Sequence, residues 1–196
     1  MEIEELEEIL KKYKLNKPKT LVKEAEEQSL PFMLTTFRSL IFEGIPPTQN
    51  AFILEFKNNH PDLKIRGIVS RLKRAYMSYI REYHLGFLLE KYFDDVTYDE
   101  EIDISGVDYV IKYKGIYFNI HAFVNTKNSR YWRRRKNKRH KFTGEHIDVP
   151  MNLSKGKKVG KFFLYTENDI TKLRRKMDKV ATEPNEANVE STSSPL

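Results

Sequence analysis

The chain has 196 residues, with 35 Lys and Arg against 28 Asp and Glu, a net charge of +7 and no cysteine. The lack of cysteine excludes a disulfide framework, a thiolate zinc site and a cysteine nucleophile. A hydrophobic fraction of 39% is ample for a packed core, whereas the apolar runs are too short for a membrane span. The first ten residues are acidic, unlike an export signal, so we expect a soluble, cytoplasmic protein that is not secreted and has no membrane association.

Almost the whole first half of the chain is predicted to be helical. Apolar residues at helical spacing predict one or two charged helices over 1–30, a further helix over 30–43 and a long one over 63–93. Thr48 is a suitable N-cap for a helix that runs to about Asn58. Three helices with short turns and a basic third member fit a helix-turn-helix module or an ordinary helical bundle, and we favour the bundle.

After the long helix the apolar pattern changes from helical to alternating, which predicts a sheet. Three successive strands are expected over 96–102, 106–113 and 115–124. Lys114 and Gly115 stand where a tight hairpin turn would place them, so the second and third strands should be antiparallel neighbours. The third strand is almost continuously apolar, as expected for a central strand that is buried on both faces.

The segment beyond the third strand is predicted to return to helix and then to irregular chain. A basic helix is expected after residue 126, followed by an irregular stretch that includes Gly144 and Pro150. A short buried strand over 161–166 and a helix over 168–180 should complete the fold. We interpret the polar group made by His140, Glu145, His146 and Asp148 as loop, in which His146 or Asp148 could close over a phosphate.

These elements together predict an α+β fold with an α/β core, in the order helix, three strands, helix, strand, helix. We expect an N-terminal helical region over 1–62 and a core over 63–180. The last residues, 181–196, are polar with few apolar groups, and we expect them to be disordered.

Positive charge is concentrated in the second half of the chain. Residues 109–180 contain twenty Lys and Arg against five acids, and nine of the fifteen residues of 127–141 are cationic, with Tyr131 and Trp132 among them. Cations interleaved with aromatic side chains are typical of surfaces that bind phosphates and stack on bases. The alternatives are a solvated basic helix or a localisation signal.

Three polar residues interrupt the predicted second and third strands. Asn119 and His121 alternate along the third strand and therefore share one face, and Asp108 at the start of the second strand should come beside them. Glu90 on the long helix could add a second carboxylate. Two carboxylates beside an imidazole are a credible divalent-metal site, and a metal next to a basic helix suits phosphodiester hydrolysis. The alternatives are a turn cap for Asp108 and core hydrogen bonds for Asn119 and His121. Glu82 competes with Glu90 for the inward face of the helix.

The region 80–180 resembles the PD-(D/E)xK, or restriction-endonuclease-like, nuclease superfamily. The resemblance is carried by Gly86-Phe-Leu-Leu-Glu90, by Ser105-Gly-Val-Asp108 and by Asn119-Ile-His121. It implies a metal-binding aspartate at Asp108 and a helix glutamate at Glu90. The third-strand motif departs from the family, which has Glu or Gln, one apolar residue and then Lys.

This departure leaves three alternatives open. His121 could act as base or ligand in a variant site, Lys127 could have taken the role of the family lysine, or the fold could bind DNA without cutting it. The first reading is a DNA endonuclease in which Asp108 and Glu90 hold Mg²⁺ or Mn²⁺, Asn119 orients water or phosphate, and Lys127 offsets charge.

In that reading cationic and aromatic side chains of the basic run contact the nucleic acid: Lys127, Arg130, Trp132, Arg133, Arg134, Arg135, Lys138 and Arg139. The second reading is a DNA-binding module without catalysis. An RNA-binding protein is a third and weaker reading, because the same side chains would stack on unpaired bases. By analogy with nucleases that cut both strands of a duplex, a homodimer is also considered.

Overall fold

The computed structural model describes residues 1–18, 22–27, 33–98, 107–127, 129–131 and 144–182. The described helices and strands form an α+β fold, as predicted. The six labelled α-helices are α1 (Ile3–Lys12), α2 (Lys23–Glu27), α3 (Met33–Ser39), α4 (Gln49–Asn59), α5 (Ile68–Tyr92) and α8 (Glu167–Thr182). The predicted disordered tail lies outside the described residues beyond Thr182. In the described part of the chain, every helix is too short or too polar to cross a lipid bilayer.

The helix boundaries follow local capping and backbone signals. The hydroxyl of Thr48 accepts a hydrogen bond from the N–H of Ala51, which confirms its predicted role as N-cap of α4. Helix α5 begins five residues after its predicted start, because Gly67 has a left-handed backbone (φ 85°) and separates it from the preceding turn. The predicted helix over 30–43 is shorter, since α3 ends at Ser39.

One mixed sheet contains β1 (Val96–Thr97), β2 (Tyr109–Tyr113), β3 (Ile116–Val124) and β4 (Glu145–Met151), in that order across the sheet. The first three strands are antiparallel, and β4 runs parallel to β3. The β2–β3 hairpin turns at Lys114 and Gly115, whose φ angles of 50° and 80° are those of the tight turn that the sequence predicts. Strand β3 is central, as expected.

The segment that was expected to be loop forms β4, so that interpretation was wrong. The strand expected over 161–166 is present as β6 (Phe162–Leu164), and it pairs with β5 (Lys157–Val159) in a separate sheet. Ile147, Val149 and Met151 are buried, so apolar residues occupy every second position in this part of β4, as a strand requires. Pro150 suggested a break, but an edge strand tolerates proline because one of its sides needs no ladder hydrogen bond.

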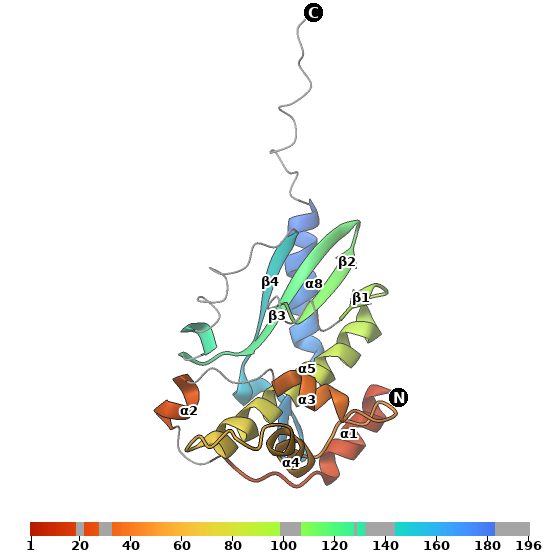
Figure 1. Cartoon of the computed structure of the whole chain (residues 1–196). Coiled ribbons are helices and arrows are strands. Elements are labelled where there is room, and N and C mark those ends of the chain that lie inside the picture. The colour runs from red at the N-terminus through yellow and green to blue at the C-terminus, as the bar shows by residue number, and fades with distance from the viewer. Residues whose placement is uncertain (19–21, 28–32, 99–106, 128, 132–143, 183–196) are drawn as a thin grey trace, which may run out of the picture.

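Two clusters of buried apolar side chains share α5. The second half of α5 packs with the four-stranded sheet and with α8, which crosses behind that sheet in Figure 1. The first half of α5 packs with α1, α3, α4 and the β5–β6 hairpin. The N-terminal helices therefore share a core with residues 157–164, and the predicted boundary between residues 62 and 63 stays a prediction.

Candidate functional site

The two faces of β3 differ in chemistry. Phe118, Ile120 and Ala122 alternate along the strand and lie in the apolar cluster with α5 and α8. Asn119 and His121 lie between them on the opposite face, because successive side chains of a strand point to opposite sides. They are also buried, with exposed fractions of 6% and 3%. Buried polar side chains away from the apolar core mark this face as the candidate site.

Asp108 lies directly beside these residues. Its backbone N–H donates to the carbonyl of Ile120 at 2.9 Å, and its carboxylate accepts a hydrogen bond from the N–H of Ala122 at 2.5 Å. Asp108 is thus fixed against the backbone of β3, through its N–H at Ile120 and through its carboxylate at Ala122. The structure therefore places Asp108 beside the part of β3 that carries Asn119 and His121, the other two residues that the sequence singled out.

Strand β4 adds a second histidine to this face. The imidazoles of His121 and His146 are joined by a hydrogen bond of 2.9 Å between Nε2 of His121 and Nδ1 of His146. Their rings are 5.2 Å apart and almost parallel, at 7°. The strand register pairs His146 with Asn119, and Asp148 with His121. The interpretation of His146 and Asp148 as loop residues is therefore corrected.

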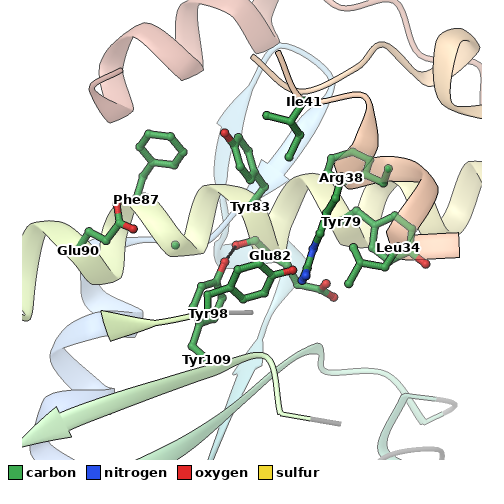
Figure 2. A pocket seen from close by; sticks show the side chains of 12 residues that line it. Leu34, Arg38, Ile41, Tyr79, Glu82, Tyr83, Phe87, Glu90, Tyr98 and Tyr109 are labelled. Carbon is green, nitrogen blue, oxygen red and sulfur yellow. Dashed lines mark hydrogen bonds between the residues drawn. The ribbon is translucent and has the colours of Figure 1, made fainter. Parts of the chain in front are cut away.

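The two candidate helix carboxylates have different surroundings. The side chain of Glu90 is exposed on α5. Glu82 is half-buried, and its backbone carbonyl accepts a hydrogen bond from the Tyr109 hydroxyl at 2.7 Å (Figure 2). Burial, and then the charges of Glu82 and Asp108, hold the pKa of Tyr109 well above its usual range. Burial, Asp108 and Glu82 do the same to the pKa of Tyr165. Glu82 thus shares two tyrosine neighbours with Asp108. The role of Glu90 as a metal ligand stays a prediction.

The basic segment, residues 127–141, begins shortly after the end of β3. Residues 127 and 129–131 are helical, and the hydroxyl of Thr126 accepts a hydrogen bond from the N–H of Ser129 at 3.1 Å, as an N-cap does. Lys127 and Arg130 are exposed there, close in sequence to the end of β3 that carries His121. The other predicted nucleic-acid contacts lie outside the described residues: Trp132, Arg133, Arg134, Arg135, Lys138 and Arg139.

The side chains that are available as metal ligands limit how a metal ion could be held. In the residues that the structure describes, no group of three or more His, Cys, Asp or Glu side chains is arranged to bind a metal. Mg²⁺ needs fewer protein ligands, since it usually binds one or two carboxylates together with water and substrate phosphates. Asp108 fits such an ion as an oxygen donor, whereas the imidazoles of His121 and His146 are ligands that suit Zn²⁺ and other transition metals better than Mg²⁺.

Comparisons with protein-family models, with curated proteins and with solved structures found no match to this chain. The assignment of function therefore depends on the residues of the polar face and on the charge of the chain.

Proposed function

We propose that the chain is a nuclease that hydrolyses DNA at the polar face of β3, with Mg²⁺ or Mn²⁺ as cofactor. The observation that carries this proposal is the hydrogen-bonded pair of imidazoles made by His121 and His146, together with the Asp108 carboxylate held at the N–H of Ala122, one residue beyond His121. The carboxylate would provide an oxygen donor and the imidazole pair a proton carrier. The restriction-endonuclease-like arrangement that the sequence resembles belongs to the same proposal.

Each residue has a distinct role in this proposal. The metal ion, when bound, would polarise the phosphate and favour formation of hydroxide. Asp108 would orient that ion through its carboxylate. His121 would accept a proton from water, because its hydrogen bond to His146 fixes its ring and allows the proton to be passed on. Asn119 would orient water or phosphate.

Positive charge supports nucleic acid as the substrate. The chain carries a net charge of +7, and Lys127 and Arg130 are exposed beyond the end of β3. Cations at this position would hold the phosphate backbone over the polar face and release counterions on binding. Lys127, six residues after His121 in the sequence, would also offset negative charge in the transition state.

A second candidate function is DNA binding without cleavage. It is favoured by the hydrogen bond between the Asp108 carboxylate and the Ala122 N–H, which gives that carboxylate a structural role. It is also favoured by Asn119 at the position where the resemblance requires an acid or Gln, because an amide is a weaker metal ligand than a carboxylate.

The test is incubation of the full chain with supercoiled plasmid, single-stranded DNA and RNA in EDTA, Mg²⁺ or Mn²⁺. The variant is Asp108→Asn, and the control is Asp178→Asn, which removes a carboxylate that hydrogen-bonds Lys114 at the hairpin end of the sheet. We expect metal-dependent nicking of DNA that Asp108→Asn abolishes and the control preserves.

The other outcomes separate the alternatives. Intact substrates together with a salt-sensitive gel shift would favour the binding module. The same gel shift on RNA alone would make RNA the partner. If no nucleic acid is bound or cut under any of these conditions, the proposed function is overturned.

A further inference from the structure

The β5–β6 hairpin has two faces of different chemistry. Val159, Phe162 and Leu164 are buried in the apolar cluster that the hairpin shares with the N-terminal helices. Lys157 alternates onto the same face, where its ammonium pairs with the Glu7 carboxylate at 2.6 Å. The opposite face is made by the remaining strand residues, and none of the roles proposed for the polar face uses it.

This outer face combines positive charge with an exposed ring. Lys158 and Phe163 are cross-strand partners and therefore share the face, and Phe163 is 38% exposed. Lys155 ends the 3₁₀ helix η1 (Leu153–Lys155) just before the hairpin, and Lys161 lies in the hairpin turn; both side chains are exposed. We call Lys155, Lys158, Lys161 and Phe163 the basic hairpin surface.

The charge of the basic hairpin surface is not neutralised within the described part of the chain. Residues 149–166 contain four lysines and no acid, and only Lys157 among the four is paired there, with Glu7. The other three lysine side chains make no hydrogen bond or ion pair with a described residue. The Phe163 ring likewise makes no ring–ring or cation–π contact in the described ranges. Three cations and one ring can therefore contact a partner.

The backbone of the hairpin is held in place by its neighbours. Nε of Arg81 on α5 donates to the carbonyl of Phe163 at 3.1 Å. Gly160 in the turn has φ 55°, and a Cβ atom there would lie 2.9 Å from the Cα of Lys11, so the turn packs closely against α1. A surface that is fixed in this way loses little backbone entropy when it binds a ligand.

The hairpin begins at the end of the sheet where β3 and β4 finish. The N–H of Asn125 donates to the carbonyl of Met151 at 2.8 Å, so the two parallel strands end side by side (Figure 1). Lys127 follows β3 by three residues, and η1 follows β4 by two. Gly156 then packs against the Met151 side chain. The cations that follow β3 and the basic hairpin surface therefore leave the sheet at the same end.

We propose that the basic hairpin surface binds a single-stranded stretch of the DNA that the polar face acts on; this inference rests on the proposed function. Surfaces that hold single strands combine cations, which contact phosphates, with aromatic side chains on which bases stack. The three lysines supply the first kind of contact, and the Phe163 ring supplies the second. A duplex offers only its phosphates, because its bases are stacked on one another.

The experiment measures fluorescence anisotropy of the full chain with a labelled run of twelve thymidines and with a labelled twelve-base-pair duplex. The variants are Phe163→Ala and Lys158→Gln. Their controls are Phe42→Ala, an exposed ring outside the hairpin, and Lys64→Gln, an exposed lysine in the loop before α5. Thermal unfolding of each variant checks that it is folded.

We expect Phe163→Ala to weaken binding of the thymidine run by about fivefold or more, as loss of one stacked base does, and to leave binding of the duplex nearly unchanged. Lys158→Gln should reduce the slope of log affinity against log salt concentration for the thymidine run by about 0.7, the value for one phosphate contact on a single strand. Both controls should bind as the unchanged chain does.

The contrary results separate this inference from the proposed function. If both variants bind the thymidine run with the affinity and salt slope of the unchanged chain, the single-strand surface is overturned while the proposed function stands. Binding of the duplex alone has the same consequence. So does sedimentation with phosphatidylserine vesicles that Phe163→Ala abolishes while its affinity for the thymidine run stays intact. If neither oligonucleotide is bound and plasmid is not cut, both proposals fall together.

Discussion

The two faces of β3 are both buried, but they differ in what is buried. On one face Phe118 and Ile120 pack against α5 and α8, and on the other Asn119 and His121 lie among polar side chains. Apolar burial stabilises the fold, whereas each buried polar group costs free energy unless it is hydrogen-bonded. The hydrogen bond between His121 and His146 offsets that cost, and the gathering of polar side chains on one face of β3 is the physical basis for proposing a function there.

The largest expected effect lies on the apolar face. Phe118 is fully buried in the sheet core, so Phe118→Ala should lower the free energy of unfolding by about 3–5 kcal/mol through lost contacts and the resulting cavity. Urea unfolding followed by circular dichroism measures this loss. A loss below about 1 kcal/mol would show that the two faces do not differ as described.

Gly86→Ala tests the contact between α5 and the apolar face of the sheet. A Cβ atom at this position would lie 2.8 Å from the Tyr109 hydroxyl, which donates to the carbonyl of Glu82. The clash should lower the free energy of unfolding by about 1–3 kcal/mol. Thermal unfolding of this variant beside the unchanged chain measures the loss. An unchanged melting temperature in Gly86→Ala would contradict the close contact.

A second buried histidine lies outside the polar face, so it shows what a buried histidine does elsewhere in this fold. His84 on α5 hydrogen-bonds Glu7 of α1 at 3.0 Å, and Lys157 pairs with the same carboxylate at 2.6 Å. Its Nδ1 atom has no hydrogen-bond partner among the described residues. We infer that this cluster is structural and that it fixes α1 against α5.

The cluster predicts that acid destabilises the fold. Burial lowers the pKa of His84 from its usual 6.5, in spite of the opposing effect of Glu7. Burial would raise the pKa of Glu7, but hydrogen bonds from Lys157 and His84 offset this and lower it. Both groups bind protons more readily in the unfolded chain, so the stability they contribute is present above pH 6.5 for His84 and above pH 4.5 for Glu7, and is lost as the pH falls.

Urea unfolding at pH 7.5 and pH 5.0 tests this effect. The free energy of unfolding should fall by on the order of 1 kcal/mol between these values, and His84→Gln should reduce the difference. Nuclease activity at pH 7.5 should be unchanged in that variant. A pH difference that is the same with and without His84 would assign the titration to other groups.

Much of the fold is encoded in local patterns. The hairpin at Lys114 and Gly115, the N-cap at Thr48 and the central position of β3 were predicted because turn chemistry and strand period act over a few residues. Strand β4 was missed because Pro150 suggested a break, and only pairing with β3 reveals that this strand lies at an edge. The β5–β6 hairpin has a local turn signal in Gly160, but its packing against distant helices in a separate sheet is not encoded locally.

The candidate site was also predicted in part. Asp108, Asn119 and His121 lie on one hairpin, so register and alternation placed them together. His146 comes from a strand 25 residues away, and its hydrogen bond to His121 depends on the parallel pairing of β4. The alternation of Ile147, Val149 and Met151 was the signal that could have identified it.

The most direct test of the account changes two adjacent residues on opposite faces of β3. The measurement is the initial rate of metal-dependent DNA nicking by His121→Ala and by Ile120→Val, with the free energy of unfolding of each. We expect His121→Ala to lower the rate by about 10²–10⁴-fold. We expect Ile120→Val to lower the free energy of unfolding by about 0.5–1.5 kcal/mol and to leave the rate unchanged. Equal rates in the two variants, whether both intact or both reduced, would contradict the assignment of function to the polar face.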